Sequence, residues 1–119
     1  MAIVSSHALD AVRGHHAAGL KVRLQRLDPG APVTLFDTAT DDGGRLVQQV
    51  ELDPRHRDAQ YELSFGVGDF VAAHSAGAVS PLLQTTVLRF AMPDPAARYH
   101  FPLSITPASC SVLAVVQPA

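Results

Sequence analysis

The stretch RYHFPL, residues 98–103, decides how the rest of the sequence is interpreted. If it forms a strand, side chains alternate between two faces, which puts Tyr99, Phe101 and Leu103 on one of them. That apolar face is predicted to pack in a core. His100 then lies on the opposite face, where a rigid strand would hold it for a functional site. Taken alone, the stretch is also typical of a half-buried strand whose histidine merely meets solvent.

The composition is that of a folded chain. At 119 residues, the sequence is predicted to form one domain over residues 1–119. Its 47% hydrophobic and 17% charged residues favour a packed core over disorder, and leave apolar surface for contacts between subunits. A net charge of -2 with scattered basic residues gives no electrostatic footprint for nucleic acid or an anionic membrane.

Cysteine usage and the chain start bear on location. The one cysteine, Cys110, cannot form an internal disulfide, and in an apolar stretch it is predicted to be a small packed hydrophobe. The first residues, MAIVSSH, lack the basic head and long apolar run of a secretion signal. No stretch approaches the roughly 18 uninterrupted apolar residues of a transmembrane helix. We therefore expect a soluble cytoplasmic protein.

Alternation between apolar and polar residues recurs along the whole chain, separated by turn signals such as DPG and DDGG. A helix is predicted only over 68–74, with Asp69 as its N-cap and with Phe70 and Ala73 on the face that packs. These features predict an all-β antiparallel sandwich of about eight strands with one short helix. The predicted strands cover 3–9, 20–26, 33–37, 45–50, 61–65, 83–92, 98–105 and 111–116, of which 83–92 is the longest.

Further polar residues could contribute chemistry. Ser5 and His7 share one face of the first predicted strand. His15 and His16 fall in a polar connection, where adjacent histidines point apart and make a poor chelate, so a solvated loop without a metal is predicted. Arg45 directly follows the DDGG turn, where it is either a surface charge or an anion clamp.

Four segments occur in a characteristic order: VSSHALD (4–10) with a glycine downstream, TDDGGR (40–45), YELSF (61–65) and YHFPL (99–103). Together they resemble the transthyretin-like family, in particular its 5-hydroxyisourate hydrolases. The resemblance runs from about residue 4 to residue 107. It implies a homotetramer, a dimer of dimers in which dimers form by edge-strand pairing and meet around a channel lined by one sheet of each subunit.

The resemblance also implies a chemistry, which is the hydrolytic opening of a purine-derived ring without a cofactor. The residues that match the family's catalytic set are His7, Arg45 and His100. A neutral imidazole can take a proton from water as it attacks a cyclic carbonyl, while a guanidinium holds the oxyanion that develops. Arg45 would also disfavour protonation of the imidazoles. Either histidine could be the base, the other then positioning water or substrate.

The end of the chain departs from the family pattern. The hydrolases typically finish with Tyr-Arg-Gly-Ser, a tail that reaches into a neighbouring active site, whereas this sequence has LAVV at 113–116 and three further residues. His16 stands where the first loop usually has proline, and Arg98 where a histidine is common. Substrate contacts are expected from the residues around the matching set, which are Ser5, Ser104, Leu113 and Val115.

Three functions are compatible with this pattern. The first is ring-opening hydrolysis of 5-hydroxyisourate itself. The second is a divergent enzyme that acts on another, less polar small molecule by hydrolysis or by acid/base-catalysed cyclisation, since an apolar tail leaves polar groups of a ligand without partners. The third is a non-catalytic carrier of a small aromatic ligand. The pair of histidines with Arg45 favours an enzyme, because these side chains bring little apolar burial to a wet sheet face.

Overall fold

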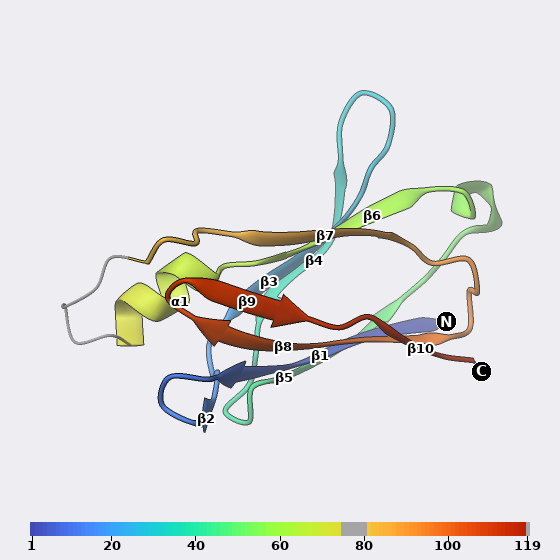
Figure 1. Cartoon of the computed structure of the whole chain (residues 1–119). Coiled ribbons are helices and arrows are strands. Elements are labelled where there is room, and N and C mark those ends of the chain that lie inside the picture. Colours follow the sequence, from blue (N-terminus) through green and yellow to red (C-terminus); the bar gives the residue numbers. More distant parts are fainter. Residues whose placement is uncertain (75–80, 119) are drawn as a thin grey trace.

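Two β-sheets packed face to face form most of the molecule (Figure 1). The computed structural model describes residues 1–74 and 81–118. The sandwich predicted from the sequence, with one short α-helix, is confirmed, although the described residues divide into ten strands rather than about eight. In chain order the elements are β1 (Ala2–Asp10), β2 (His15–His16), β3 (Lys21–Arg26), β4 (Val33–Ala39), β5 (Arg45–Val50), the 3-10 helix η1 (Pro54–His56), β6 (Gln60–Phe65), α1 (Val67–His74), β7 (Thr86–Ala91), β8 (Arg98–Thr106), β9 (Ser109–Val112) and β10 (Val115–Gln117).

Strand β1 lies inside the first sheet. It pairs in parallel with β8 and antiparallel with β5 and β2, while β8 carries β9 and β10 on its other side. The second sheet has the order β4-β3-β6-β7, with antiparallel pairs throughout. Cys110 of β9 packs against the core between the sheets, as predicted. The largest buried side chains of that core include Tyr61, Leu63 and Phe65 of β6 and Tyr99, Phe101 and Ile105 of β8.

Side chains alternate along β1 and β8 as the sequence predicted. In β8, Tyr99, Phe101 and Leu103 are buried in the core, whereas His100 between them is only partly buried. The same alternation in β1 leaves His7 partly exposed between two buried neighbours. The two strands therefore turn their polar positions to the same side, away from the second sheet. We call this side of the first sheet the outer face.

The final strand is interrupted. The sequence predicted one strand over 111–116, but the structure divides this segment between β9 and β10, which keep a single register along β8. The interruption lies opposite Pro102, which accepts a hydrogen bond of 3.0 Å from the Leu113 backbone. Proline has no N–H to donate in return, so the ladder breaks at this point. Beyond the break, Val115 lies directly opposite His100.

Strand β7 is shorter than predicted. It covers Thr86–Ala91 instead of 83–92, so the longest strands are β1 and β8, with nine residues each. The apolar positions of this segment do face one way, because Leu88 and Phe90 are partly buried and Met92 is buried. Alternation thus identified the buried face of this strand but overestimated its length.

Helix α1 begins one residue earlier than predicted. Its first backbone hydrogen bond runs from Phe70 to Gly66, so Asp69 lies inside the first turn and the prediction that it caps the helix is wrong. Phe70 and Val71 are buried, whereas Ala73 is exposed, because the buried stripe of this short helix ends at Val71, before the last turn. No helix of residues 1–74 and 81–118 is long and apolar enough to cross a membrane.

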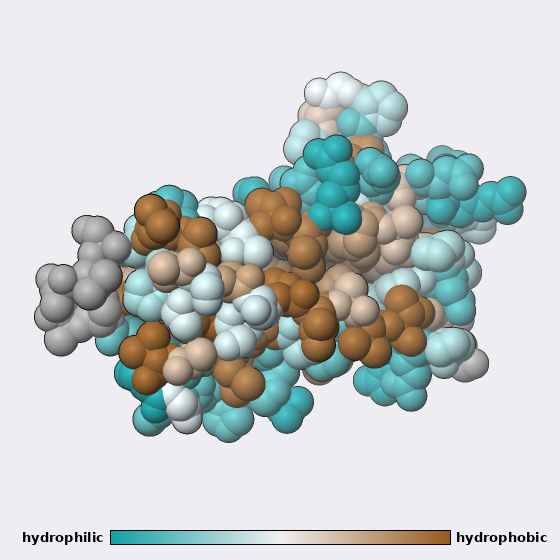
Figure 2. Space-filling view, viewed as in Figure 1, coloured by the Kyte–Doolittle hydropathy of each residue, from teal (hydrophilic) through white to brown (hydrophobic). Residues whose placement is uncertain are grey.

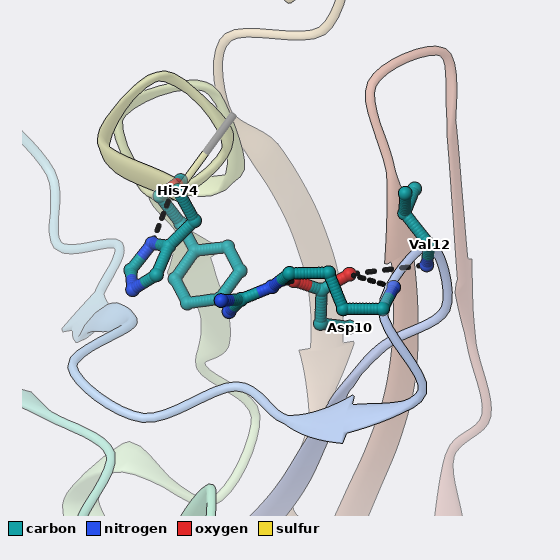
Figure 3. Close-up of polar contacts among 5 residues, drawn as sticks. Asp10, Val12 and His74 are labelled. Atoms are coloured by element: carbon teal, nitrogen blue, oxygen red, sulfur yellow. Dashed lines mark hydrogen bonds and ion pairs between the residues drawn. The ribbon is translucent and has the colours of Figure 1, made fainter. Parts of the chain in front are cut away.

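The turn after β1 brings the chain back to the first sheet (Figure 3). Asp10 accepts hydrogen bonds from the backbone of Val12 (3.0 Å) and Arg13 (3.1 Å), and from Nε of Arg13 (2.8 Å). Burial alone would raise the pKa of Asp10, but these hydrogen bonds lower it below its ordinary value. Near this carboxylate, His74 stacks on Phe70 with 4.2 Å between ring centroids. The turn then leads directly into β2.

Candidate active site

The residues predicted to be catalytic come from three adjacent strands of the first sheet. His7 of β1 lies opposite Arg45 of β5, and Ser5 of β1 lies opposite His100 of β8. Residues that oppose each other on paired strands project from the same side of a sheet. His7, Arg45 and His100 therefore share the outer face.

A serine hydroxyl fixes the ring of His100. Oγ of Ser5 lies 2.8 Å from Nδ1 of His100, within a partly buried part of the outer face. The hydroxyl can donate or accept, depending on which ring nitrogen carries the proton. In either case the hydrogen bond holds the ring and leaves Nε2 as the atom that is free to meet a ligand. Ser5, predicted to contact substrate, therefore also orients a histidine.

Arg45 is held by the turn that precedes β5. Oδ1 of Asp41 accepts hydrogen bonds of 2.9 Å from the backbone of both Gly43 and Arg45. Gly44 has a φ of +70°, and a Cβ added there would lie 2.5 Å from the carbonyl oxygen of Ala8 in β1. Only glycine fits so close to the neighbouring strand. In the described part of the chain the Arg45 side chain forms no ion pair, so its charge is available on the outer face.

A third histidine joins the site. The sequence predicted that His15 and His16 lie in a solvated loop, but they form β2, in which His16 pairs with Leu9 of β1. Nε2 of His7 lies 3.1 Å from Nδ1 of His16, and the two ring centroids are 5.2 Å apart. The prediction that the two adjacent histidines point apart fits this arrangement, because only His16 contacts His7. A two-residue strand carries no alternation of its own, so nothing in the sequence indicated that His16 would contact His7.

The surroundings of His7 lower its pKa below the ordinary value. Burial is the largest cause, followed by the positive charge of Arg45 and by His16, while His100 adds a smaller contribution. A backbone hydrogen bond with Gly43 acts in the opposite direction. His7 is consequently neutral, and able to accept a proton, at a lower pH than an isolated histidine.

Apolar side chains border the imidazoles. Val115, opposite His100, is 48% exposed, and Leu113 beside Pro102 is 66% exposed. Both residues, predicted to contact substrate, thus lie next to the histidine strand. Ser104 lies four residues beyond His100 on β8, about 13 Å further along the strand. It is the predicted contact residue that the structure does not bring close to His100.

Within one chain the site is an open surface. Four of the clefts in the described part of the molecule are lined by other residues, and none of these four includes His7, Arg45 or His100. Among the described residues, no three His, Cys, Asp or Glu side chains converge as they would to hold a metal ion. The groups present on the outer face are three imidazoles, a guanidinium and hydroxyls, which suit proton transfer and anion stabilisation.

Known proteins resemble this chain over most of its length. It is 37% identical over 114 residues to a 5-hydroxyisourate hydrolase of Deinococcus radiodurans, with 91% of each chain covered. The solved structure of an (S)-allantoin synthase matches with a TM-score of 0.74 and 28% identity, covering 96% of this chain but 43% of that chain. The 5-hydroxyisourate hydrolase of Klebsiella pneumoniae matches with a TM-score of 0.76 over 97% of this chain and 99% of that one, and at 24% identity this likeness shows the fold.

A family model described as "HIUase/Transthyretin family" matches residues 4–113. The matched region includes His7, Arg45 and His100 and ends two residues before β10. The fold, the relatives and the family match agree with the resemblance that the four sequence segments indicated. This chain belongs to the HIUase/Transthyretin family.

Proposed function

We propose that this protein is a hydrolase that opens the ring of 5-hydroxyisourate, with His7, Arg45 and His100 at its active site. Several relatives at 32–37% identity are named 5-hydroxyisourate hydrolase, which supports a hydrolase acting on a cyclic heterocycle. The observation that carries the proposal is the cross-strand register, in which His7 opposes Arg45 and the serine-held His100 projects from the same outer face.

The chemistry follows from the charge states of these side chains. A neutral imidazole removes a proton from water as the water oxygen bonds to the ring carbonyl carbon, and the Arg45 guanidinium stabilises the oxyanion. When the oxyanion collapses, the carbon–nitrogen bond of the ring breaks and the imidazolium returns its proton to the departing nitrogen. One of His7 and His100 is the base, and the other positions the water or the substrate.

A homotetramer would complete the site. The outer face exposes Leu9, Val47 and Val115 around the histidines, with exposed fractions of 42%, 60% and 48%. Apolar residues also gather where β7, β9 and β10 form one edge of the sandwich (Figure 2), including Val87 and Val116. Pairing along this edge would form a dimer, and two dimers meeting through the outer face would turn an open surface into a walled channel.

A second candidate function is hydrolysis or acid/base-catalysed cyclisation of a less polar small molecule. The specific observation behind it is the apolar border of the site, since Val115 opposes His100 and Leu113 follows the same strand edge. A polar substrate edge buried against such side chains without a hydrogen-bond partner would lose about 1–3 kcal/mol. A substrate with an apolar flank would instead gain from the same contact.

The decisive experiment follows the ultraviolet decay of freshly generated 5-hydroxyisourate with the native protein, with His100→Ala and with His15→Ala. His15 is the matched control, because it is an exposed histidine of the same sheet whose side chain makes no hydrogen bond to any other described residue. We expect fast decay with the native and His15→Ala proteins and a loss of about 10²–10⁴-fold in His100→Ala. Undiminished turnover in His100→Ala would remove this residue from the site. Decay no faster than in buffer with the native protein would favour the second candidate.

A further inference from the structure

We propose that His16 is a positioning residue for His7, the two imidazoles sharing one proton along a nitrogen-to-nitrogen hydrogen bond that fixes the His7 ring and favours its neutral form. The inference deepens the proposed function, on which it rests, because it takes His7 as part of the active site. It concerns a residue that the predicted catalytic set does not contain.

The backbone delivers His16 to the outer face. His16 pairs with Leu9, which is two residues beyond His7 on β1 and therefore projects from the same side of the sheet. The next residue of the loop, Ala17, donates its N–H to the Ala8 carbonyl at 2.9 Å, and Ala8 in turn donates to the Gly44 carbonyl at 2.8 Å. The loop that carries His16 is thus hydrogen-bonded to β1 at Ala8. The same residue of β1 is hydrogen-bonded to the turn that precedes Arg45.

Thr40 adds a second attachment for this loop. Its buried hydroxyl donates to the Ala17 carbonyl at 2.6 Å and accepts from the Leu20 N–H at 2.9 Å. Ala17 and Leu20 are both fully buried. The residue after His16 is therefore fixed by main-chain and side-chain hydrogen bonds, and His16 is held in place rather than left on a loose loop.

The hydrogen bond between the two rings needs one proton between the facing nitrogens, and it is lost when both of these nitrogens are protonated. Nε2 of His7 and Nδ1 of His16 are 3.1 Å apart, so either nitrogen can donate while the other accepts. If both rings were protonated on both nitrogens, two N–H groups would face each other, the hydrogen bond would be lost and two cations would stand side by side. A half-protonated pair therefore costs less than a fully protonated one.

The other groups around His7 act in the same direction. Arg45 faces it from β5, His100 from β8 and His16 from β2, and each positive charge opposes protonation of His7. The Asp41 carboxylate of the preceding turn is occupied by two backbone N–H groups. The Gly43 backbone favours the charged ring, but it is outweighed. His16 thereby extends the pH range in which His7 stays neutral.

The test compares His16→Ala, His16→Asn and the matched control His15→Ala with the native protein. Ring nitrogens of His7 are followed by NMR against pH in ¹⁵N-labelled protein, which reports the pKa and the protonated nitrogen without any turnover. The rate of 5-hydroxyisourate decay is measured over the same pH range. Asparagine at position 16 can still hydrogen-bond to Nε2 of His7, but it cannot carry a charge.

We expect the His7 titration, and with it the acid limb of the rate profile, to move to higher pH in both His16 variants. The maximal rate should fall about tenfold in His16→Ala, equivalent to about 1.4 kcal/mol of barrier, and should recover in His16→Asn. In His15→Ala, the titration of His7 and the rate of 5-hydroxyisourate decay should match those of the native protein. A His7 titration that is unchanged in both His16 variants, or shifted equally in His15→Ala, would overturn the proposal.

The two measurements separate this inference from the proposed function. If the NMR titration shifts as expected while no variant accelerates the decay of 5-hydroxyisourate, the histidine pair is supported and the proposed substrate is wrong. If the decay is fast and abolished in His100→Ala but insensitive to both His16 variants, the hydrolase is supported and the positioning role is wrong. Circular dichroism of each variant excludes loss of fold as the cause of a lower rate.

Discussion

Replacing Thr40 by valine should destabilise the fold at the junction that supports the active-site loops. Thr40 directly precedes the turn that leads to Arg45, and its hydroxyl links Ala17 and Leu20 through two hydrogen bonds. Its own backbone adds two more, accepting from Gly19 at 3.1 Å and donating to Leu20 at 2.9 Å. Valine keeps the volume and the backbone bonds and removes only the hydroxyl.

The expected magnitude follows from the groups that lose their partners. In Thr40→Val, the Leu20 N–H and the Ala17 carbonyl remain buried with nothing to replace the hydroxyl. Each orphaned polar group costs about 1–3 kcal/mol, which gives a loss of about 2–6 kcal/mol in unfolding free energy. For a chain of this size the melting temperature should fall by about 8 °C or more. Because the volume is unchanged, no cavity contribution is expected.

Urea unfolding at one fixed protein concentration measures this loss, since association would otherwise change the apparent stability. Thr34→Val is the matched control, because its exposed hydroxyl accepts, among the described residues, only from the Gln25 side chain, at 3.2 Å. The control should stay within about 0.5 kcal/mol of the native protein. If Thr40→Val were as stable as Thr34→Val, the hydroxyl would not carry the junction and the reasoning would be refuted.

Three other predictions follow from the same contacts. Because hydrogen bonds lower the pKa of Asp10, its contribution to stability is present above about pH 4 and is lost as the pH falls through the lower pKa of the folded state. Asp10→Asn should therefore lower the urea midpoint at neutral pH and flatten its decline in acid. Gly44→Ala should cost about 1–3 kcal/mol in a thermal melt, whereas Gly43→Ala, whose Cβ would find space, should cost much less. Val116→Lys should reduce the mass in solution by breaking edge pairing. Val12→Lys, at a position that is 65% exposed in the turn after β1 against 57% for Val116, should leave the mass unchanged.

Period-two alternation explains how much of the outer face could be predicted. In an extended strand the backbone itself decides which side chains share a face, so the sequence around His100 was enough to assign its side. The same rule placed Ser5 and His7 together on β1. Which strands become neighbours does not follow from alternation, and here the resemblance to a known family supplied the expectation that His7, Arg45 and His100 share one sheet.

The features that escaped prediction depend on single contacts between distant segments. His16 reaches His7 because β2 pairs with the end of β1, and a strand of two residues has no periodicity to detect. A proline inside a strand pattern indicates that hydrogen bonding to a neighbouring strand is interrupted. The position of the break, before Val115, depends on which segment pairs with the strand at Pro102, and the sequence does not show that pairing. Helix α1 shifted by one residue because helix ends are determined by local hydrogen bonds more than by composition.

The identities of the residues on the outer face are better explained by chemistry than by sheet stability. Alternate positions on neighbouring strands gain most from β-branched or aromatic pairs, and valine occupies such positions next to this site at Val47 and Val115. At His7, Arg45 and His100 the chain instead carries side chains that hydrogen-bond, titrate or hold charge. The identity of His16 is explained in the same way. Solvent exposure alone does not require an imidazole at this position, whereas the hydrogen bond to His7 does use one. An apolar border around polar reactive groups would exclude water from them once a second face covers the sheet, and it would strengthen every charge interaction inside.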